Sequence, residues 1–356
     1  MKAKKFLAML MVGATVFSLT ACGGSKQEAP KKEEAPKQEQ TQAEAPASPA
    51  VTIQIGYENN PGEPLDIACN EWKRLIEEKS NGTMTVELFP SSQLGSKTDL
   101  MDQMQMGEGV ITLCEGSFWA DYGAPELGIM SAPYLYDSWD QCWKLVESDW
   151  YAEQCAILQE QGFHVLTSNW AYGTRELMTT KPVRTLDDVS GMIIRTPNNV
   201  LQMKTWENMG AAPTAMALGD VYTATQQGTI DGMENPMATL YGQAYYEVAK
   251  YITMIDYIMM PIQWCTSETW FQSLTAEQQK ILCESGDEAG LVMNQKLEEM
   301  TSDYIAKMEE NGVEIIVPND AEQARFKEAA LKIYDNPDVT KGWRDGLYDY
   351  ITDIIK

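Results

Sequence analysis

Apolar and polar residues alternate along much of the chain with two different periods, which predict strands and helices in turn. A period of two runs over 51–57 and over 83–89, as expected for strands. Between them, apolar residues recur every three or four positions over 65–76 and mark one face of a helix. This helix is expected to end near Asn81 and Gly82, where the chain can turn. The order of strand, helix and strand favours an α/β fold.

The same alternation continues towards the C-terminus. Further strands are predicted at 110–113, 163–167, 192–195 and 314–317. Further helices are predicted at 98–106, 201–209 and 221–227, and two more follow the last strand. The sequence shows no internal repeat of solenoid period. By length alone, the roughly 300 residues after position 50 are enough for two ordinary domains.

One predicted helix is unusually long. Thr275 and Gln278 have the spacing of a capping box, in which each side chain accepts a hydrogen bond from the other residue's backbone. Helix-compatible sequence then continues to about Asn311, which is long for a globular helix. Gly286 and Gly290 lie inside it, where they could bend it. A helix of this length is expected to reach past a single domain.

The N-terminal segment predicts export and a lipid anchor. Lysines among the first five residues precede a mostly apolar run over 6–19, which is shorter than the roughly 20 residues of a membrane-spanning helix. Small residues then lead to Cys22, the expected site of cleavage and acylation, so residues 1–22 are interpreted as a lipoprotein signal peptide with its acceptor cysteine. An ordinary signal peptide that happens to contain a cysteine is the alternative. Residues 23–50 have little apolar content beyond alanine and are expected to form a mobile tether.

Charge and residue types exclude several classes of function. The net charge of −25 and the pI near 4.4 argue against nucleic acid and against adsorption to anionic lipid. The single histidine, His164, cannot supply a multi-histidine metal site and is expected to be structural. No phosphate-binding loop, dinucleotide fingerprint or nucleophile elbow is present, so no metal, cofactor or catalytic residue is predicted. The cysteines after Cys22 form no CxxC pair and are expected to be buried thiols, with disulfides left open.

The arginines are few and unevenly placed. Of the six in the chain, Arg175, Arg184 and Arg195 fall within one short window. Arg184 lies in a polar turn and is expected at the surface. Arg195 ends a β-branched run, and the C-terminal ends of strands are where α/β sheets present ligand contacts. In so acidic a chain, Arg175 and Arg195 suggest the capture of an anion by paired hydrogen bonds, although ordinary ion pairs with nearby carboxylates are the alternative.

A series of short motifs follows in a characteristic order. They are Phe89-Pro90-Ser91-Ser92-Gln93-Leu94-Gly95, Pro133-Tyr134-Leu135-Tyr136, Gly173-Thr174-Arg175, Lys181-Pro182, the run 186–197 that ends in Arg195-Thr196-Pro197, Gly210-Ala211-Ala212-Pro213-Thr214, the run 220–236 that ends in Glu234-Asn235-Pro236, and Tyr245-Tyr246-Glu247-Val248. In this order they resemble the DctP-like solute-binding proteins of TRAP (tripartite ATP-independent periplasmic) transporters. The resemblance covers essentially everything after the tether.

The resemblance implies a two-lobed α/β fold of the periplasmic-binding-protein type, with a long helix that spans both lobes. The chain would cross between the lobes more than once. Residues 51–172 and 261–300 are expected to form lobe I, and residues 173–260 and 301–356 are expected to form lobe II.

The resemblance also implies roles for particular residues. Arg195 matches the arginine that pairs with the ligand carboxylate, Arg175 matches a second arginine beside it, and Asn235 matches an asparagine that hydrogen-bonds the same group. Glu115 matches a polar pocket position in some members. Tyr257 stands where a histidine is frequent, and it is counted among the expected substrate-binding residues.

Some positions depart from the family pattern. Leu218 replaces a common aromatic residue, and Asp220 replaces a glutamate. Glu234 could be read as a catalytic acid, but in the family it belongs to the motif at a strand end. These changes are compatible with carboxylate capture, whereas the identity of the ligand does not carry over.

The resulting functional prediction is a lipid-anchored, extracytoplasmic receptor, not an enzyme, that captures a small organic acid and delivers it to TRAP-type membrane subunits. It needs no cofactor. The first alternative is the receptor of an ATP-driven importer, which shares the lobed architecture. Less expected are a secreted hydrolase that uses paired carboxylates and an adhesion lipoprotein with no ligand in its cleft.

Overall fold

The fold is built on one mixed β-sheet, seen in a computed structural model that describes residues 50–356. The predicted signal peptide, Cys22 and nearly all of the predicted tether lie outside the described residues. The strands are β1 Val51–Gly56, β2 Met84–Phe89, β3 Val110–Cys114, β4 Phe163–Thr179, β5 Ile193–Thr196, β6 Ala212–Ala215, β7 Gly232–Pro236, β8 Tyr251–Ser267 and β9 Glu314–Ile316. The α/β class is confirmed.

The sheet has parallel ends joined by an antiparallel centre. Its strand order is β2-β1-β3-β8-β4-β7-β5-β6, and β9 pairs with β8 outside this path. At one end β1 is parallel to β2 and β3, and at the other end β5 is parallel to β6 and β7. In the centre β8 is antiparallel to β3 and β4, and β4 is antiparallel to β7. The two parallel ends are therefore linked through β4 and β8.

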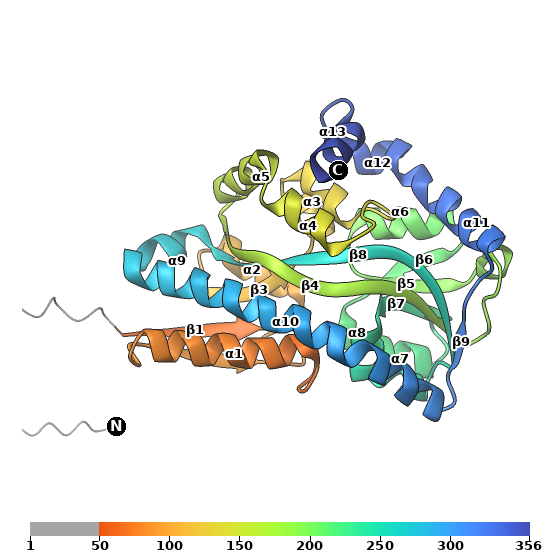
Figure 1. The fold of residues 1–356 in the computed structure, drawn as a ribbon, viewed down its shortest axis with the longest axis horizontal. Helices are drawn as coiled ribbons and strands as arrows, with labels where there is room; N and C mark the ends of the chain where they lie inside the picture. Colours follow the sequence, from red (N-terminus) through yellow and green to blue (C-terminus); the bar gives the residue numbers. More distant parts are fainter. Residues whose placement is uncertain (1–49) are drawn as a thin grey trace, which may run out of the picture. The chain divides into compact units, whose positions relative to one another are not determined.

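The strands β4 and β8 are each 17 residues long and run side by side across the molecule (Figure 1). Irregularities interrupt their pairing at several points, one of them between Arg175 and Leu177. The sequence predicted only 163–167 of β4. Both strands are buried on both faces over long stretches, so their apolar residues do not alternate and the period of two is lost.

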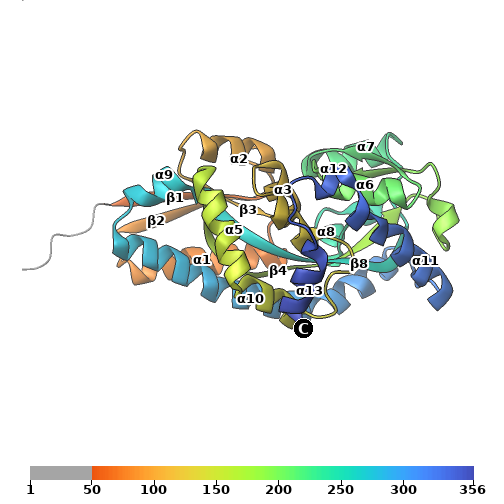
Figure 2. The ribbon, with the colours of Figure 1, turned by 90° about the horizontal axis from the view of Figure 1, so that it is seen from above.

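The helices flank this sheet. They are α1 Pro64–Lys79, α2 Lys97–Gln105, α3 Gly116–Asp121, α4 Trp139–Val146, α5 Asp149–Glu160, α6 Val200–Asn208, α7 Val221–Gln226, α8 Met237–Gly242, α9 Glu268–Ser273, α10 Ala276–Glu310, α11 Asp320–Leu331, α12 Pro337–Thr340 and α13 Leu347–Ile355. Short 3₁₀ turns are η1 Pro125–Ser131, η2 Leu186–Val189, η3 Leu218–Asp220, η4 Tyr245–Glu247 and η5 Lys332–Asp335. Figure 2 shows α2 and α3 gathered around β3, and α6 and α7 around the other end of the sheet.

The long helix α10 is confirmed, with 35 residues. Its N-terminus carries the predicted capping box: Thr275 Oγ1 accepts from Gln278 N at 3.3 Å, and Gln278 Oε1 accepts from Thr275 N at 2.9 Å. The helix packs on α1 at one end, on β4 in the middle and on α8 and β9 at the other end (Figure 1). It therefore spans the fold from α1 to α8 and β9, and between them it crosses β4, one of the two strands that join the parallel ends.

The C-terminal region differs from the prediction of two helices. Three helices, α11, α12 and α13, follow β9, because Asn336 and Pro337 interrupt the helical stretch and start the short α12. The last helix, α13, buries Leu347, Ile351 and Ile355 in the same hydrophobic cluster as residues of α4. The predicted lobe boundaries are untested and stay a prediction.

The core contains a cluster of three tryptophans from distant parts of the chain. Trp72, Trp170 and Trp264 are fully buried, and their ring centroids lie 5.2 to 5.8 Å apart. The indole N–H groups of two of them donate to backbone carbonyls of α10: Trp72 to Leu282 at 3.0 Å and Trp170 to Gly286 at 3.0 Å. This cluster joins α1, β4, β8 and α10.

Within residues 50–356 all six cysteines are free thiols. Four are buried, as expected, whereas Cys155 and Cys283 are half-buried.

Candidate functional site

Three adjacent strands bring the predicted anion-binding residues together. Arg175 lies on β4, Asn235 on β7 and Arg195 on β5, and these strands are neighbours in the order β4-β7-β5. Arg195 lies one residue before the end of β5, as predicted from its position after a β-branched run. The side chains of all three residues line one cavity of about 370 Å³, a size usual for small-molecule sites. We call it the solute pocket.

Arg195 is a buried cation without a carboxylate partner. Its side chain is only 3% exposed, and its Nε and Nη2 donate to Met216 O at 2.9 and 2.6 Å. Among the described residues it forms no ion pair. Burying a charge without a counter-charge is costly. An anion bound in the solute pocket would remove that cost.

Arg175 has a counter-charge of its own. Its guanidinium forms an ion pair with the fully buried Glu234 through Nε, and its Nη2 donates to Glu234 Oε1 and to the Glu234 carbonyl, both at 2.9 Å. Burial alone would lower the pKa of Arg175, but the Glu234 carboxylate outweighs it and the pKa is raised. The alternative of an ordinary ion pair therefore holds for Arg175 and not for Arg195.

A glycine two residues before Arg175 fits its surroundings for a steric reason. Gly173 has a φ of +130°, and a Cβ at this position would lie 2.7 Å from Pro236 Cβ. Any other residue would be strained there and would push β7 away from β4. The glycine of the Gly173-Thr174-Arg175 motif therefore keeps β4 close to Pro236, the neighbour of Asn235.

Asn235 presents an unsatisfied donor. The residue is 2% exposed, and its Nδ2 has no hydrogen-bond partner among residues 50–356. Buried amide groups are nearly always paired, so an orphaned donor in a pocket needs an explanation. A ligand oxygen would supply the missing acceptor.

The other wall of the solute pocket comes from α2 and β3. Lys97, the first residue of α2, forms a buried ion pair with Glu115, which follows β3, at 2.6 Å. Burial alone would lower the pKa of Lys97, but the carboxylates of Glu115 and Glu58 raise it above its ordinary value. The Lys97 ammonium also lies 4.7 Å from the centre of the Phe118 ring. This wall offers both a cation and carboxylate oxygens to a polar ligand.

Of the five predicted substrate-binding residues, four line the solute pocket: Arg175, Arg195, Asn235 and Glu115. Tyr257 does not line it. This residue is fully buried, and its hydroxyl donates to Glu234, the partner of Arg175. Trp206 Nε1 donates in turn to the Tyr257 hydroxyl at 3.4 Å. The structure therefore places Tyr257 behind Arg175.

Other lining residues were not predicted. They are Glu58, Ser96, Lys97, Thr98, Phe118, Tyr172, Pro197, Asn198, Ala215, Met216, Ala217 and Leu218. Lys97 carried a usable signal, because it follows the Leu94-Gly95-Ser96 turn and stands at the N-terminus of a predicted helix. Glu58 carried a weaker one, as an acidic residue directly after a predicted strand.

The structure also shows the surroundings of His164 and Arg184, the two other residues singled out in the sequence. His164 Nδ1 lies 2.6 Å from Glu268 Oε2, and its ring stacks on Phe271, so the prediction of a structural histidine is confirmed. Arg184 is exposed and pairs with Glu314 at 2.6 Å, as expected of a surface residue. In residues 50–356 no cluster of side chains is arranged to hold a metal ion. No helix of the same segment is long and apolar enough to cross a membrane.

Comparison with known proteins gives a family for the chain. The family model of bacterial extracellular solute-binding proteins, family 7 (DctP), matches residues 55–338. The sialic acid-binding periplasmic protein SiaP of Vibrio cholerae is 28% identical over 309 residues, which are 84% of this chain and 92% of that protein. The 2,3-diketo-L-gulonate-binding periplasmic protein YiaO of Escherichia coli is 26% identical, over 79% of this chain and 84% of that protein.

Solved structures agree with the family model. A TRAP periplasmic solute-binding protein from Ochrobacterium anthropi with bound L-fuconate is 42% identical, has a TM-score of 0.83, and is matched over 86% of this chain and 100% of that chain. A TRAP periplasmic solute-binding protein from Actinobacillus succinogenes with bound L-galactonate is 32% identical, has a TM-score of 0.81, and is matched over 85% of this chain and 99% of that chain.

Proposed function

Because the chain belongs to the bacterial extracellular solute-binding proteins of family 7, a family of TRAP receptors and not of enzymes, we propose that its solute pocket binds a sugar acid. The observation that carries the proposal is that one cavity contains both Arg195, which is buried and has no carboxylate partner among residues 50–356, and the unsatisfied side-chain N–H donor of Asn235. The family finding also decides between the two receptor alternatives in favour of the TRAP class over the ATP-driven importers. Its members are extracytoplasmic and work with TRAP membrane subunits.

In the proposed complex the carboxylate lies between Arg195 and Asn235. Arg195 supplies the charge, and Asn235 Nδ2 donates to a carboxylate oxygen. Arg175 borders the same position, held in place by Glu234. Tyr257 positions Glu234 and acts on the ligand only through Arg175.

The hydroxyl groups of the ligand face the second wall. Glu115 and Glu58 offer acceptors, and Lys97 offers a donor. A polyol chain carries hydroxyls that donate and accept, so it suits a wall of mixed polarity better than an apolar acid does. The relatives with bound L-fuconate and L-galactonate support this class of ligand.

Binding would favour a closed state of the two-lobed receptor. Glu58, Lys97 and Glu115 come from the segment before β4, whereas Arg195 and Asn235 come from the segment after it. A ligand that bridges both groups stabilises the conformation in which the groups are close, by its differential affinity for that state.

A thermal-shift and calorimetric screen of residues 50–356 tests the ligand proposal. We expect L-fuconate or L-galactonate to raise the Tm, and the matching neutral sugars, L-fucose and L-galactose, to have no effect. Arg195→Ala removes the charge-assisted hydrogen bonds of the complex and should weaken binding by more than about 30-fold, since such a loss costs about 2 kcal/mol or more.

The matched control is Arg184→Ala, an exposed arginine outside the solute pocket, which should bind like the unchanged protein. Full affinity in Arg195→Ala, or equal binding of the neutral sugars, would show that carboxylate capture at Arg195 is the wrong assignment. If sn-glycerol 3-phosphate bound more tightly than either sugar acid, the anionic group that the pocket recognises would be a phosphate and not a carboxylate.

We further propose that Cys22 carries the lipid that holds the protein at the membrane. The apolar run before Cys22 and the small residues at its end support this proposal. A lipid anchor raises the effective concentration of the receptor near its membrane subunits. Cys22→Ser should move the protein from the membrane fraction to the soluble fraction of cells. Mass spectrometry of an N-terminal peptide that begins at Cys22 without acyl chains would contradict the proposal.

A further inference from the structure

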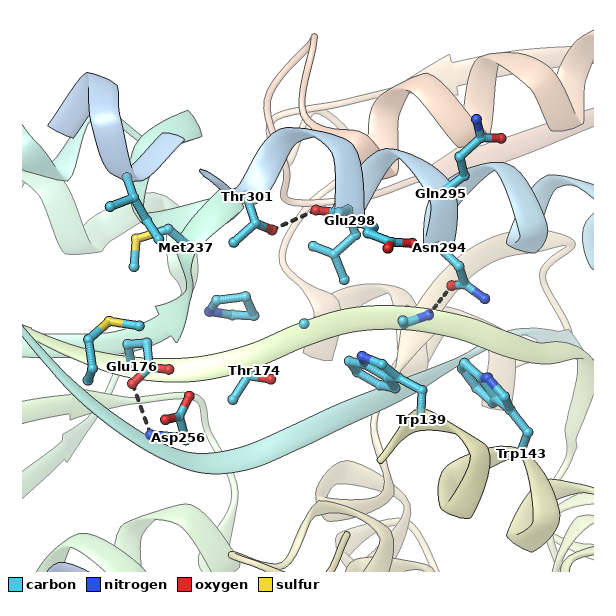
Figure 3. Close-up of a pocket in the computed structure, with 16 residues that line it drawn as sticks. Trp139, Trp143, Thr174, Glu176, Met237, Asp256, Asn294, Gln295, Glu298 and Thr301 are labelled. Carbon is cyan, nitrogen blue, oxygen red and sulfur yellow. Dashed lines mark hydrogen bonds between the residues drawn. The ribbon is translucent and has the colours of Figure 1, made fainter. Parts of the chain in front are cut away.

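A second cavity, larger than the solute pocket, lies between α10, α4 and the crossing strands β4 and β8. Its volume is about 770 Å³, and we call it the α10 cavity. Figure 3 shows α10 on one side of it, with Asn294, Glu298 and Thr301 along the helix, and the side chains of Trp139 and Trp143 on the other side. None of its lining residues lines the solute pocket. It is therefore a separate space.

The ionisable side chains that line the α10 cavity are all acidic. Of the residues that the structure describes, three with carboxyl groups line it, namely Glu176, Asp256 and Glu298, and no lysine, arginine or histidine does. Lys327 lines a neighbouring cavity beyond Asp256, but its ammonium lies 5.4 Å from the Tyr134 ring centre, and within residues 50–356 neither it nor any other cation forms an ion pair with Asp256. An anionic solute is excluded from such a space, whereas a cation is attracted.

The most deeply placed of these carboxyl groups is Glu176, which is 2% exposed. Its Oε2 accepts from Ile255 N at 2.7 Å and from Asp256 N at 3.0 Å, and the Asp256 side chain lies beside it (Figure 3). Burial, and then the neighbouring Asp256 carboxyl, raises the pKa of Glu176 well above its ordinary value. Glu176 therefore favours its protonated form, and the negative charge of the cavity comes from Asp256 and Glu298.

Most of the remaining lining is apolar or aromatic, and four lining residues are polar without charge: Thr174, Asn294, Gln295 and Thr301. Trp139 and Trp143 stack with their ring centroids 5.7 Å apart and an angle of 19° between their planes. Both rings line the cavity and stay partly exposed to it. Leu297, Pro236 and Met237 complete an apolar surface. Indole rings beside carboxylates are the combination that binds organic ammonium groups, because the ring faces attract a cation and the apolar surface covers its carbon atoms.

We propose that the α10 cavity is a second binding site, for a small organic cation that carries its charge on an apolar or aromatic body. The cationic group lies near Asp256 and Glu298, and the body packs against Trp139 and Trp143. The site also borders the solute pocket through the backbone: Glu176 follows Arg175 on β4, and Pro236 follows Asn235 on β7.

The test measures the binding of benzyltrimethylammonium to residues 50–356 that carry 5-fluorotryptophan, by fluorine NMR. Trp139→Phe and Trp143→Phe assign the two resonances. We expect saturable shifts of both resonances with benzyltrimethylammonium and much weaker ones with benzyl alcohol, which has a similar ring and no charge. Glu298→Gln and Asp256→Asn should each weaken binding about threefold, as expected for exposed charges. Asparagine tolerates the φ of +48° at position 256, so the fold should persist.

The matched control is Glu299→Gln, the next residue on α10, which pairs with Lys296 at 2.6 Å and does not line the cavity. It should leave the affinity unchanged, and so should Arg195→Ala, which alters only the solute pocket. Equal binding of benzyl alcohol would overturn the proposal. So would an absence of saturable shifts at Trp139 and Trp143, or an equal loss of affinity in Glu299→Gln.

Discussion

At the scale of single residues, the solute pocket is a set of charges that are paired or left unpaired by their neighbours. Glu234 neutralises Arg175, and Glu115 neutralises Lys97. Within the described segment, Arg195 is left with only the Met216 carbonyl as a side-chain partner. The cation that lacks a carboxylate is therefore the one that an incoming anion can neutralise, and this difference sets the orientation proposed for the ligand.

Glu63 predicts a pH dependence of stability. This N-cap residue of α1 is 3% exposed, and burial raises its pKa to about 7, against hydrogen bonds from Asn59 and Asn60 that lower it. An unfolded glutamate titrates near 4.5. Between these values the folded protein binds more protons than the unfolded chain, so stability falls as the pH rises through this window, by at most about 3 kcal/mol from this group.

The Glu63→Gln variant should lose this part of the pH dependence. Denaturant unfolding at pH 5 and pH 8 measures it, with Glu108→Gln, an exposed carboxyl, as the control that keeps the dependence of the unchanged protein. An unchanged difference between the two pH values in Glu63→Gln would show that Glu63 is not the titrating group.

At the scale of elements, α10 packs closely against β4, the strand that it crosses. Asn294 stabilises this contact, since its Oδ1 accepts from Ala171 N at 2.7 Å and its Nδ2 donates to Asn169 O at 2.9 Å. Gly286 and Gly290 face the same surface. The sequence suggested that these glycines could bend the helix, but a packing reason is visible for them. A Cβ at position 290 would clash with Asn169 and Trp170, and one at position 286 would lie only 3.0 Å from Trp72.

Gly290→Ala tests this close packing. A Cβ at position 290 would lie 2.8 Å from Trp170 Cδ1 and closer still to Asn169. In an exposed helix the change would stabilise the protein by about 1 kcal/mol, but here we expect a loss of about 1–3 kcal/mol from overpacking. Urea unfolding measures the change. The control is Ser302→Ala, at an exposed position of α10. Gly312 is not used for this purpose, because its φ is positive. A more stable Gly290→Ala protein would contradict the packing argument.

At the scale of the whole molecule, the solute pocket exists only because the chain passes through the centre of the sheet more than once. β4 and β8 connect the two parallel ends, so α2 and β3 of one end lie across the pocket from β5 and β7 of the other. Neither end alone contains both walls. Solute binding is therefore coupled to the arrangement of the entire described segment.

Hydrogen exchange should show this coupling. A bound sugar acid should slow amide exchange in two distant segments at once, around 95–98 at the start of α2 and around 215–218 after β6, because both line the solute pocket. Protection of only one segment would mean that the ligand does not bridge the two walls. Arg195→Ala, measured at the same ligand concentration, should show protection in neither.

Local sequence determined the elements whose pattern is set by neighbouring residues. The capping box at Thr275, the period of two in β1 and β2, and the β-branched run before Arg195 all gave elements that the structure contains, because each depends on hydrogen bonds or burial within one element. The family motifs contain Arg175, Arg195 and Asn235, and the wider resemblance adds Glu115; the structure brings all four to one cavity.

Only the tertiary structure decided which charges cancel. The length of β4 was hidden because a strand buried on both faces has no alternation to read. The pairing of Arg175 with Glu234, 59 positions away, and the position of Tyr257 behind that pair follow from strand order, as does the absence of a carboxylate beside Arg195 among the described residues. Side chains far apart in sequence interact through space, so their partners, and with them the free charge that can hold a solute, are set by the packing of the sheet.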